Sequence, residues 1–522
     1  MVLLYPKYLV NMLYHFSLTY ICKVLHYLPL YFLYEVFLMT KTISFTRIIA
    51  VLVLMFACLF SFTGCNGLPA FTDNPASTDV VEGNGTLAVT KGDYVYYTNG
   101  YKGYADVGET NKLGNITYSA LYRTKLVNGK VVENEKELDE DGEEIFDKTQ
   151  GIQHTDILVS KVCGFEYSAL YIFGDYIYYT TPNNQKNKEL QVCTDLIDFC
   201  RTRIDRSSGQ ELLYTTTNPG STVDFTMYEL DGTVYLVVMD GNSGSEQSSI
   251  VVKSFGQANN TFTTNVEDYK VTSFAKATYT SSEQVVNQAE NDVYFTYTKS
   301  DYIDTSALAK INVTTGEVTD LAYENGVSYT LKTSVGGKIY YTKSTTSTES
   351  AYIYYNTLGS NFGSSEQQLT YNDYTQFIPY SQNLGTGVIM YDSDTKTLYK
   401  KTTNDASAVQ LAENVTITSF IGVQGNIVYY IADGAVCACD YVNATAPKNL
   451  TGSLGTTKIE SARNVSIIGT KVFYLKEYSN GESTAFYMHI NDSSILDDET
   501  DANYDHFIGV LAEADYLNEP AE

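Results

Sequence analysis

The 522-residue sequence has no tryptophan and only 5 histidines, and its 34 lysines and arginines are outnumbered by 61 aspartates and glutamates. The absence of tryptophan removes the side chain on which many ligand-stacking platforms depend. The scarcity of histidine weakens general acid–base schemes that use imidazole. The formal net charge of −27 repels phosphate backbones. Nucleic acid is therefore an unfavourable partner, and tight electrostatic docking on anionic lipid is disfavoured as well.

Motifs of catalysis and metal binding are also missing. The sequence has no Gly-x-Ser-x-Gly nucleophile motif. The acidic run 139–144 lacks the alternating carboxylates and closing glutamate of a calcium loop. Cys437 and Cys439 would share one face of a strand, but no histidine stands at ligand spacing to them. We therefore predict no catalytic residue, no cofactor and no metal site.

A short motif recurs along most of the chain, and its clearest copy is Gly174–Thr180. Each copy joins a turn of glycine, aspartate or asparagine to β-branched and aromatic residues, the signal for the second strand of a hairpin. Further copies begin at Gly92, Asp231, Asn291, Gly336, Gly387, Gly425 and Gly469. The later copies recur every 40 to 50 residues or so, as four-stranded propeller blades do. We predict an all-β chain, a β-propeller of about eight blades, with seven or six as alternatives.

The tyrosine-rich copies resemble a known group of propellers. Tyr96-Tyr97-Thr98-Asn99, Tyr178-Tyr179-Thr180 and Tyr340-Tyr341-Thr342 are each followed by a strand that ends in a basic residue and a tight turn. These features are similar to YWTD and TolB-like β-propellers, and such repeats also occur in bacterial lipoproteins of unassigned function. Tyrosine replaces the central tryptophan, and Asn99 stands where the motif has aspartate. The resemblance covers about residues 87–492 and implies the fold, without a ligand site.

Residues 39–64 have the pattern of a secretion signal. Lys41 and Arg47 precede the apolar run 48–60, and Gly64-Cys65 follows it. This pattern resembles the bacterial lipoprotein signal, which implies that Cys65 carries a lipid and becomes the new amino terminus. Asn66 fits the outer face of a Gram-positive cytoplasmic membrane. We predict a lipid-anchored, extracytoplasmic protein; an ordinary signal peptide or an uncleaved anchor are the alternatives.

The remaining regions are assigned from composition. Residues 1–38 are interpreted as an extension from a mis-called upstream start, with a genuine membrane segment as the alternative. Residues 65–86 are a predicted tether, 87–500 the propeller, and 501–522 an acidic tail. In the tail, Phe507, Val510, Leu511 and Leu517 have the spacing of a short helix with Asp505 as its cap.

Five cysteines follow Cys65, namely Cys163, Cys193, Cys200, Cys437 and Cys439. Because the number is odd, at least one has no intramolecular partner, and the pairing of the others stays open.

Together these features favour a monomeric, non-enzymatic binding module for an envelope protein, peptide or glycan. The alternative is a carbohydrate-active enzyme that uses paired carboxylates in the propeller channel. A purely structural envelope component is a third reading.

Overall fold

The computed structural model describes residues 69–102, 117–130, 155–163, 169–183, 196–216, 224–241, 248–256, 261–263, 270–275, 291–298, 305–345, 348–358, 362–372, 374, 376–382, 385–451, 465–479, 484–492 and 506–508. The chain divides into two compact units, Met1–Gly67 and Leu68–Glu522. The predicted upstream extension, signal peptide and Cys65 all fall in the first unit, which lies outside the described residues. The described part of the chain contains no helix with the length and apolar character of a membrane span.

The regular elements of the described residues are β-strands. After β1 (Val81–Glu82), the strands form consecutive antiparallel sets of four, which we call blades 1 to 8 in chain order. Blade 1 consists of β2 (Ala88–Lys91), β3 (Tyr94–Lys102), β4 (Thr117–Lys125) and β5 (Thr155–Cys163), and blade 2 of β6 (Tyr171–Phe173), β7 (Tyr176–Pro182), β8 (Ile197–Arg203) and β9 (Glu211–Thr215). Blade 3 consists of β10 (Asp224–Leu230), β11 (Thr233–Gly241), β12 (Ser248–Gly256) and β13 (Thr261–Thr263), and blade 4 of β14 (Lys270–Phe274), β15 (Asp292–Thr298), β16 (Ser306–Asn312) and β17 (Val318–Ala322).

Blades 5 to 8 repeat the same order. Blade 5 consists of β18 (Val327–Val335), β19 (Lys338–Thr345), β20 (Thr348–Thr357) and β21 (Gln367–Gln368), and blade 6 of β22 (Gln376–Gln382), β23 (Gly385–Asp392), β24 (Thr397–Thr402) and β25 (Val409–Ala412). Blade 7 consists of β26 (Ile417–Gln424), β27 (Ile427–Ala432), β28 (Ala435–Asp440) and β29 (Lys448–Asn449), and blade 8 of β30 (Val465–Ile468), β31 (Lys471–Ser479), β32 (Thr484–Asp492) and β33 (His506–Phe507).

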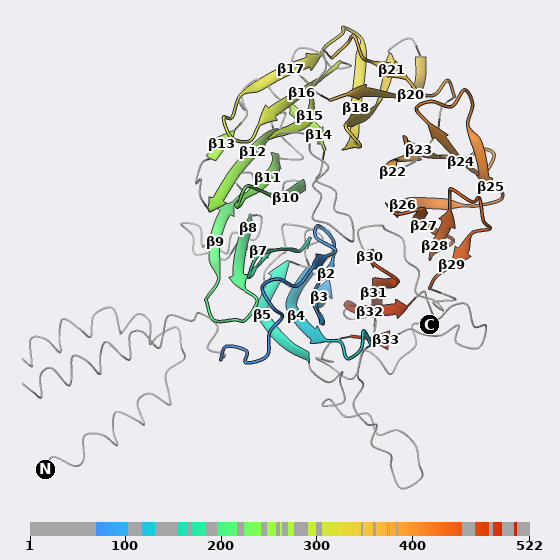
Figure 1. The fold of residues 1–522 in the computed structure, drawn as a ribbon. Coiled ribbons are helices and arrows are strands. Elements are labelled where there is room, and N and C mark those ends of the chain that lie inside the picture. Colours follow the sequence, from blue (N-terminus) through green and yellow to red (C-terminus); the bar gives the residue numbers. More distant parts are fainter. Residues whose placement is uncertain are drawn as a thin grey trace, which may run out of the picture. The chain divides into compact units, whose positions relative to one another are not determined.

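Within the second unit, the blades stand side by side around an axis (Figure 1). One apolar cluster lies between each blade and the next along the chain, and a further cluster joins blade 8 to blade 1. Each blade therefore buries both faces of its sheet against neighbours, which a single four-stranded sheet cannot do alone. The prediction of an all-β propeller is confirmed.

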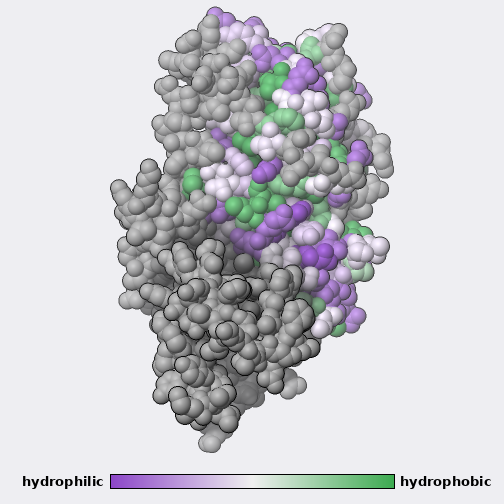
Figure 2. Space-filling model, turned by 90° about the vertical axis from the view of Figure 1, so that its left-hand side faces the viewer, coloured by the Kyte–Doolittle hydropathy of each residue, from purple (hydrophilic) through white to green (hydrophobic). Residues whose placement is uncertain are grey.

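Adjacent tyrosines in the second strands fill two of these interfaces at once. Successive side chains on a strand point to opposite faces of the sheet. Tyr96 accordingly packs between blades 1 and 2, whereas Tyr97 packs between blades 8 and 1. Tyr340 and Tyr341 divide in the same way between the two sides of blade 5. On the side that Figure 2 presents, the hydrophilic and hydrophobic residues of the described chain are interspersed over the surface.

The ring closes between the two ends of the chain without a shared blade. Blade 1 is built from the amino-terminal part and blade 8 from the carboxyl-terminal part, and β3 pairs directly with β32. The buried side chain of Asn99 bridges the junction: its Nδ2 donates to the carbonyl of Ile508 at 3.2 Å. The backbone N–H of Met488 donates to Asn99 Oδ1 at 2.6 Å.

Two sequence assignments change at the ends of the propeller. The predicted tether reaches residue 86, but part of it belongs to the propeller. The strand β1 pairs with β2, and Phe71 packs against the cluster between blades 1 and 2, where two arginine side chains lie over its ring. The predicted helix after Asp505 also differs. His506 and Phe507 form β33 and pair with β32, because the open edge of that strand offers them backbone hydrogen bonds. The rest of the tail lies outside the described residues.

Candidate functional site

The first strand of each blade lies nearest the axis, and three of these inner strands carry an irregularity (Figure 1). The pairing register with the following strand shifts by one residue at Thr272 in β14, at Lys332 in β18, and at both Thr418 and Ile421 in β26. Thr272, Lys332 and Thr418 are exposed, whereas Ile421 is half-buried. A β-bulge redirects a side chain out of the regular pleat and is over-represented beside active sites. The axis of the ring is therefore the first place to look for chemistry.

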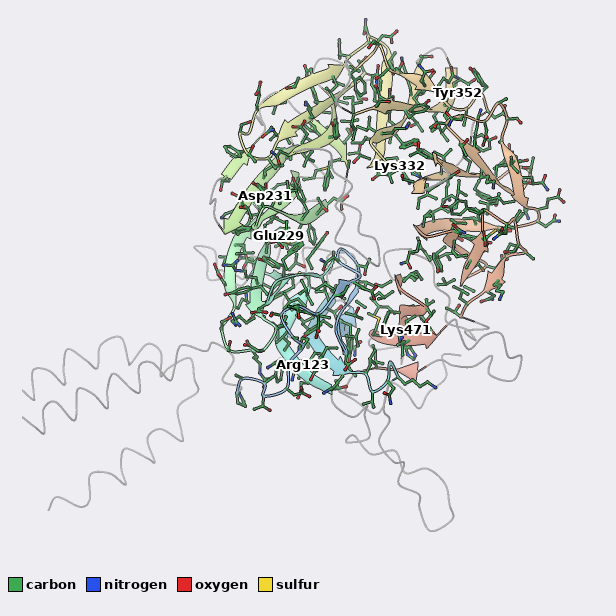
Figure 3. All side chains as sticks on the ribbon, viewed as in Figure 1. Arg123, Glu229, Asp231, Lys332, Tyr352 and Lys471 are labelled. Atoms are coloured by element: carbon green, nitrogen blue, oxygen red, sulfur yellow. The ribbon has the colours of Figure 1, made fainter. Side chains whose placement is uncertain are left out.

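Lys332 is the charged member of this group. Figure 3 places it on the inner side of the ring, near β18 and β22. Its Nζ lies 5.7 Å from the ring centroid of Phe377 in blade 6. Although part of the Lys332 side chain is exposed, the protein around its ammonium group desolvates it and lowers the pKa of Lys332, and no acidic residue contributes to the shift. At Lys91, by contrast, Asp175 and Asp79 oppose the same desolvation.

The backbone beside Lys332 is held by the preceding blade. The N–H of Leu331 donates to Ser273 Oγ at 3.3 Å, and Ser273 in turn shares a hydrogen bond with Thr296. Thr272 bonds to the same Thr296 hydroxyl at 2.8 Å. These contacts fix the bulge of β18 against β14 and β15. Lysine is a side chain whose pKa shifts readily when it is desolvated, so these contacts hold a lysine of lowered pKa at a defined place on the inner strand.

A second candidate is a cleft of about 320 Å³ at the outer edge of blades 1 and 2. Its lining residues come from the amino-terminal segment, β3, β4, β5 and the turn after β8: Pro69, Ala70, Phe71, Thr72, Asp73, Tyr94, Arg123, Lys125, Asp156 and Arg206. The ring of Phe71 lies between two guanidinium groups. The Cζ of Arg123 is 3.3 Å and that of Arg206 is 4.0 Å from its centroid.

The polar groups of this cleft bind the segment that crosses it. Arg123, only 4% exposed, donates to the carbonyl of Asp73 and to Asn74 Oδ1 at 2.9 Å, and pairs with Asp156 at 3.3 Å. Lys125 Nζ lies 2.6 Å from Asp73 Oδ2, and this bond lowers the pKa of Asp73.

The turn after β8 completes the hold on the segment. Arg206 donates to the carbonyls of Pro69 and Ile157 at 2.8 and 2.7 Å. The N–H of Phe71 donates to the carbonyl of Asp205 at 2.8 Å. We call Phe71, Arg123, Lys125, Asp73 and Arg206 the clamp, because these contacts fasten the chain to the propeller.

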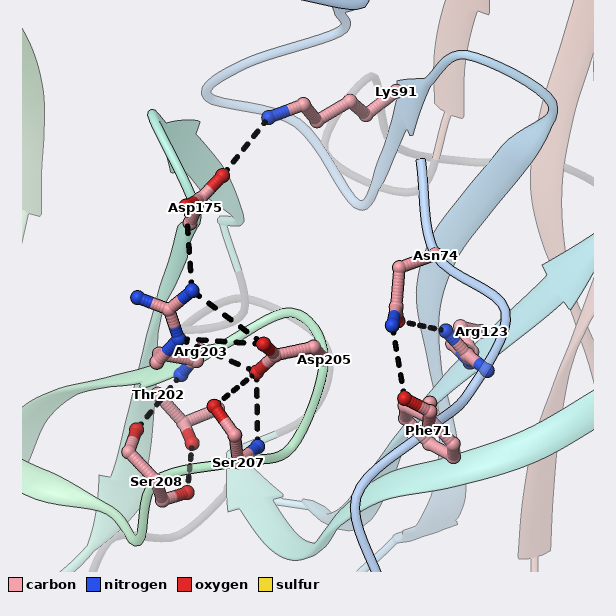
Figure 4. A network of polar contacts seen from close by, with 10 residues as sticks. All are labelled: Phe71, Asn74, Lys91, Arg123, Asp175, Thr202, Arg203, Asp205, Ser207 and Ser208. Carbon is pink, nitrogen blue, oxygen red and sulfur yellow. Dashed lines mark hydrogen bonds and ion pairs between the residues drawn. The ribbon is translucent and has the colours of Figure 1, made fainter. Parts of the chain in front are cut away.

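Ion pairs next to the clamp join blades 1 and 2 (Figure 4). Asp175 lies 3.9 Å from Lys91 of blade 1 and 3.3 Å from Arg203 of its own blade. Arg203 also contacts Asp205, whose carboxylate accepts the backbone N–H of Ser207. These bonds to Ser207 and Arg203 lower the pKa of Asp205 despite partial burial. The edge of these two blades is therefore bound together by alternating charges.

The sequence-predicted site residues do not form a site in the described chain. Cys65, Cys193 and the acidic run 139–144 lie outside the described residues. Cys200, Cys437 and Cys439 are free thiols, and burial raises their pKa to about 12, 11 and 11 respectively. Among the described residues, no group of three or more histidine, cysteine, aspartate or glutamate side chains is arranged to hold a metal ion.

Sequence reasoning missed both Lys332 and the clamp. The one local signal for Lys332 is a lysine inside the strand pattern Tyr329–Val335, next to alternating buried positions. The clamp has no local signal, because Phe71, Arg123 and Arg206 come from three distant parts of the chain. Their chemistry becomes visible once the blades are placed side by side.

No family model and no curated protein matches the sequence. Several solved structures are similar in fold. A prolyl endopeptidase has 9% identity and a TM-score of 0.42, over 79% of this chain and 54% of that one. The propeller domain of the Trilobed protease from Pyrococcus furiosus has 11% identity and a TM-score of 0.40, over 70% and 97%. An oligogalacturonate lyase from Vibrio parahaemolyticus has 8% identity and a TM-score of 0.38, over 76% and 97%.

These comparisons correct the functional prediction. The sequence predicts a non-enzymatic binding module, whereas the similar structures are a prolyl endopeptidase, the propeller domain of a protease and an oligogalacturonate lyase. None of them bears on the paired carboxylates of the alternative prediction. The chain spans about half the length of the prolyl endopeptidase it matches. At such low identity the likeness shows the β-propeller fold alone, and the activities remain those of the other proteins.

Proposed function

We propose that the chain is a propeller enzyme that acts on an anionic substrate near the ring axis, with Lys332 as the proton-accepting amine. The observation that carries the proposal is a lysine at an inner-strand bulge whose pKa is lowered by desolvation with no acidic contributor. A general base works best when its pKa lies near the operating pH. Perturbed titratable groups of this kind cluster at functional sites.

The charge of the substrate follows from what happens after proton transfer. Once Lys332 has accepted a proton, the resulting ammonium is desolvated and no acidic residue contributes to its pKa. An opposite charge close by is the most effective way to stabilise such a cation. A substrate that carries a carboxylate supplies that charge from its own structure. Acidic oligosaccharides and acidic peptides are thus the classes to test.

The test compares the full chain with its Lys332→Met and Lys338→Met variants on a panel of acidic oligosaccharides and acidic peptides. We expect turnover to fall by about 10²- to 10⁴-fold in Lys332→Met, the usual loss for a general base, and to stay unchanged in Lys338→Met. Lys338 is the matched control, because it begins the next strand of the same blade. Equal turnover in both variants, or no turnover of the whole panel by the unaltered chain, would refute the proposal.

We also propose that Cys65 carries a lipid that holds the protein on the outer face of the cytoplasmic membrane. The apolar run 48–60 and the Gly64-Cys65 pair support this assignment. Two or more acyl chains bind a membrane stably, at about 0.8 kcal/mol per buried CH₂. Mass spectrometry of the membrane fraction should find Cys65 as an acylated amino terminus, and Cys65→Ala should release the protein. An unmodified Cys65 peptide, or a peptide from before Met39, would contradict this scheme.

A further inference from the structure

The point at which the chain leaves the propeller is fixed. The carbonyl of Pro69 accepts a hydrogen bond from Arg206. Two residues later, Phe71 is enclosed by Arg123 and Arg206. The chain therefore enters the propeller at one defined place, the edge of blades 1 and 2.

The clamp shortens the connection to the proposed lipid. Only residues 66–68 separate Cys65 from Pro69. Four steps of extended chain span about 14 Å at most, whereas a free tether up to residue 86 would reach about 70 Å. If Cys65 lies at the membrane surface, Pro69 and the clamp lie within a short distance of the headgroups. The clamp therefore leaves less reach than a free tether up to residue 86 would give.

The charges around the clamp are balanced, unlike those of the chain as a whole. Five cations stand against five acids there, which gives a local charge of 5 − 5 = 0: Lys91, Arg123, Lys125, Arg203 and Arg206 against Asp73, Asp79, Asp156, Asp175 and Asp205. Over the full sequence the acids outnumber the cations by 61 to 34. Like charges repel, so the rest of the surface is disfavoured next to anionic lipid.

We propose that this edge of blades 1 and 2 is the membrane-facing surface of the propeller and lies against phospholipid headgroups. The inference rests on the proposed lipid on Cys65, which supplies the attachment, while the clamp sets the orientation. Arg206 and Lys125 stand where the chain arrives, and although they bond to the anchored segment, both remain partly exposed at this edge. The blades on the opposite side of the ring then face away from the bilayer.

Energy transfer to labelled lipids tests the orientation. The full chain is purified from membranes, its acyl mass is confirmed, and it is reconstituted in phosphatidylglycerol vesicles that contain an acceptor lipid. A donor fluorophore is introduced by a genetically encoded amino acid either at Thr72, an exposed residue of the anchored segment, or at Tyr371. Tyr371 is 74% exposed and lies between blades 5 and 6, across the ring. For a unit of this size, opposite edges are several tens of ångströms apart.

We expect transfer from Thr72 to exceed that from Tyr371 by about two-fold or more, given this separation. In a Phe71→Ala variant, which loosens the clamp, the two efficiencies should approach each other. Equal transfer from both positions in the unaltered chain would overturn the inference while leaving the lipid on Cys65 intact. A protein without an acyl mass that stays off the vesicles would overturn the lipid assignment as well, so the two failures are distinguishable.

Discussion

The closure of the ring depends on one side chain, and its removal gives a sharp prediction. Asn99 is 4% exposed and bonds to the backbone of Met488 and of Ile508, both in blade 8 or directly after it. The substitution Asn99→Ala removes both hydrogen bonds, so the N–H of Met488 and the carbonyl of Ile508 lose Asn99 as a partner. Alanine is compatible with the extended backbone of β3, so the expected loss of stability comes from the missing hydrogen bonds.

The magnitude follows from the cost of an unsatisfied buried polar group. Each of the two groups costs about 1–3 kcal/mol, so we expect a loss of about 3 kcal/mol in the free energy of unfolding. The second unit has 522 − 67 = 455 residues. With about 2.1 cal/mol/K per residue, its unfolding entropy is about 1 kcal/mol/K, so Tm should fall by about 3 °C.

A matched control separates closure from general stability. Asn84 makes the same two-bond contact, with the N–H and carbonyl of Ile172 at 2.7 and 3.1 Å, but it joins blade 1 to blade 2. Calorimetry should show a similar loss for Asn84→Ala and Asn99→Ala. Hydrogen exchange should then differ, because Asn99→Ala selectively opens blade 8 and the β3–β32 pairing. Identical exchange patterns, or a loss below about 0.5 kcal/mol for Asn99→Ala, would refute the reasoning.

Three further predictions concern single residues. Lys332→Met should stabilise the protein at pH 7, because the folded-state pKa of Lys332 is lowered and its charge therefore opposes folding. The gain should fade as pH rises from that lowered pKa towards about 10.4, the usual lysine value in the unfolded chain, and should be absent above it. Urea unfolding at pH 7 and pH 11 checks this, with Lys338→Met as control, and a gain equal at both pH values would contradict it. Burial raises the pKa of Cys200 to about 12, so its thiol should react with iodoacetamide at pH 8 about a thousand-fold more slowly in the native than in the unfolded protein. Mass spectrometry measures both alkylation rates, and comparable rates would contradict the burial of this thiol. Gly387→Ala should lower the free energy of unfolding by about 2 kcal/mol or more, because a Cβ at this position would meet the carbonyl of Lys401. Gly422→Ala has open space around the new Cβ and should change the free energy of unfolding by less than about 1 kcal/mol. Denaturant unfolding measures both variants, and equal losses would contradict the packing of blade 6.

The proposed activity and the proposed orientation use different parts of the ring. Lys332 lies on the inner strand of blade 5, and the clamp lies at the edge of blades 1 and 2. Substitutions at Lys332 should therefore leave vesicle orientation unchanged, and loosening Phe71 should leave the pKa of Lys332 unchanged. Their independence allows each proposal to fail without the other.

The strands and their grouping could be read from the amino-acid sequence because the signals are local. A glycine or asparagine turn followed by β-branched and aromatic residues, as in Gly174–Thr180, determines a hairpin within a few residues. Adjacent tyrosines such as Tyr96 and Tyr97 then require apolar surface on both faces of the blade. Repeated hairpins with that requirement pack into a ring.

Tertiary structure alone decided where the chemistry lies. The placement of Lys332 depends on a register shift between β18 and β19, and its surroundings include Phe377 of the next blade. The clamp joins Phe71 to Arg123 and Arg206, and Arg206 bonds to a carbonyl 137 residues away. Local propensities carry no information about which distant side chains meet, because that depends on how the packed blades bring them together. The sequence therefore determines the hairpins locally, whereas the position of Lys332 and the attachment of the Phe71 segment are determined by the assembled ring.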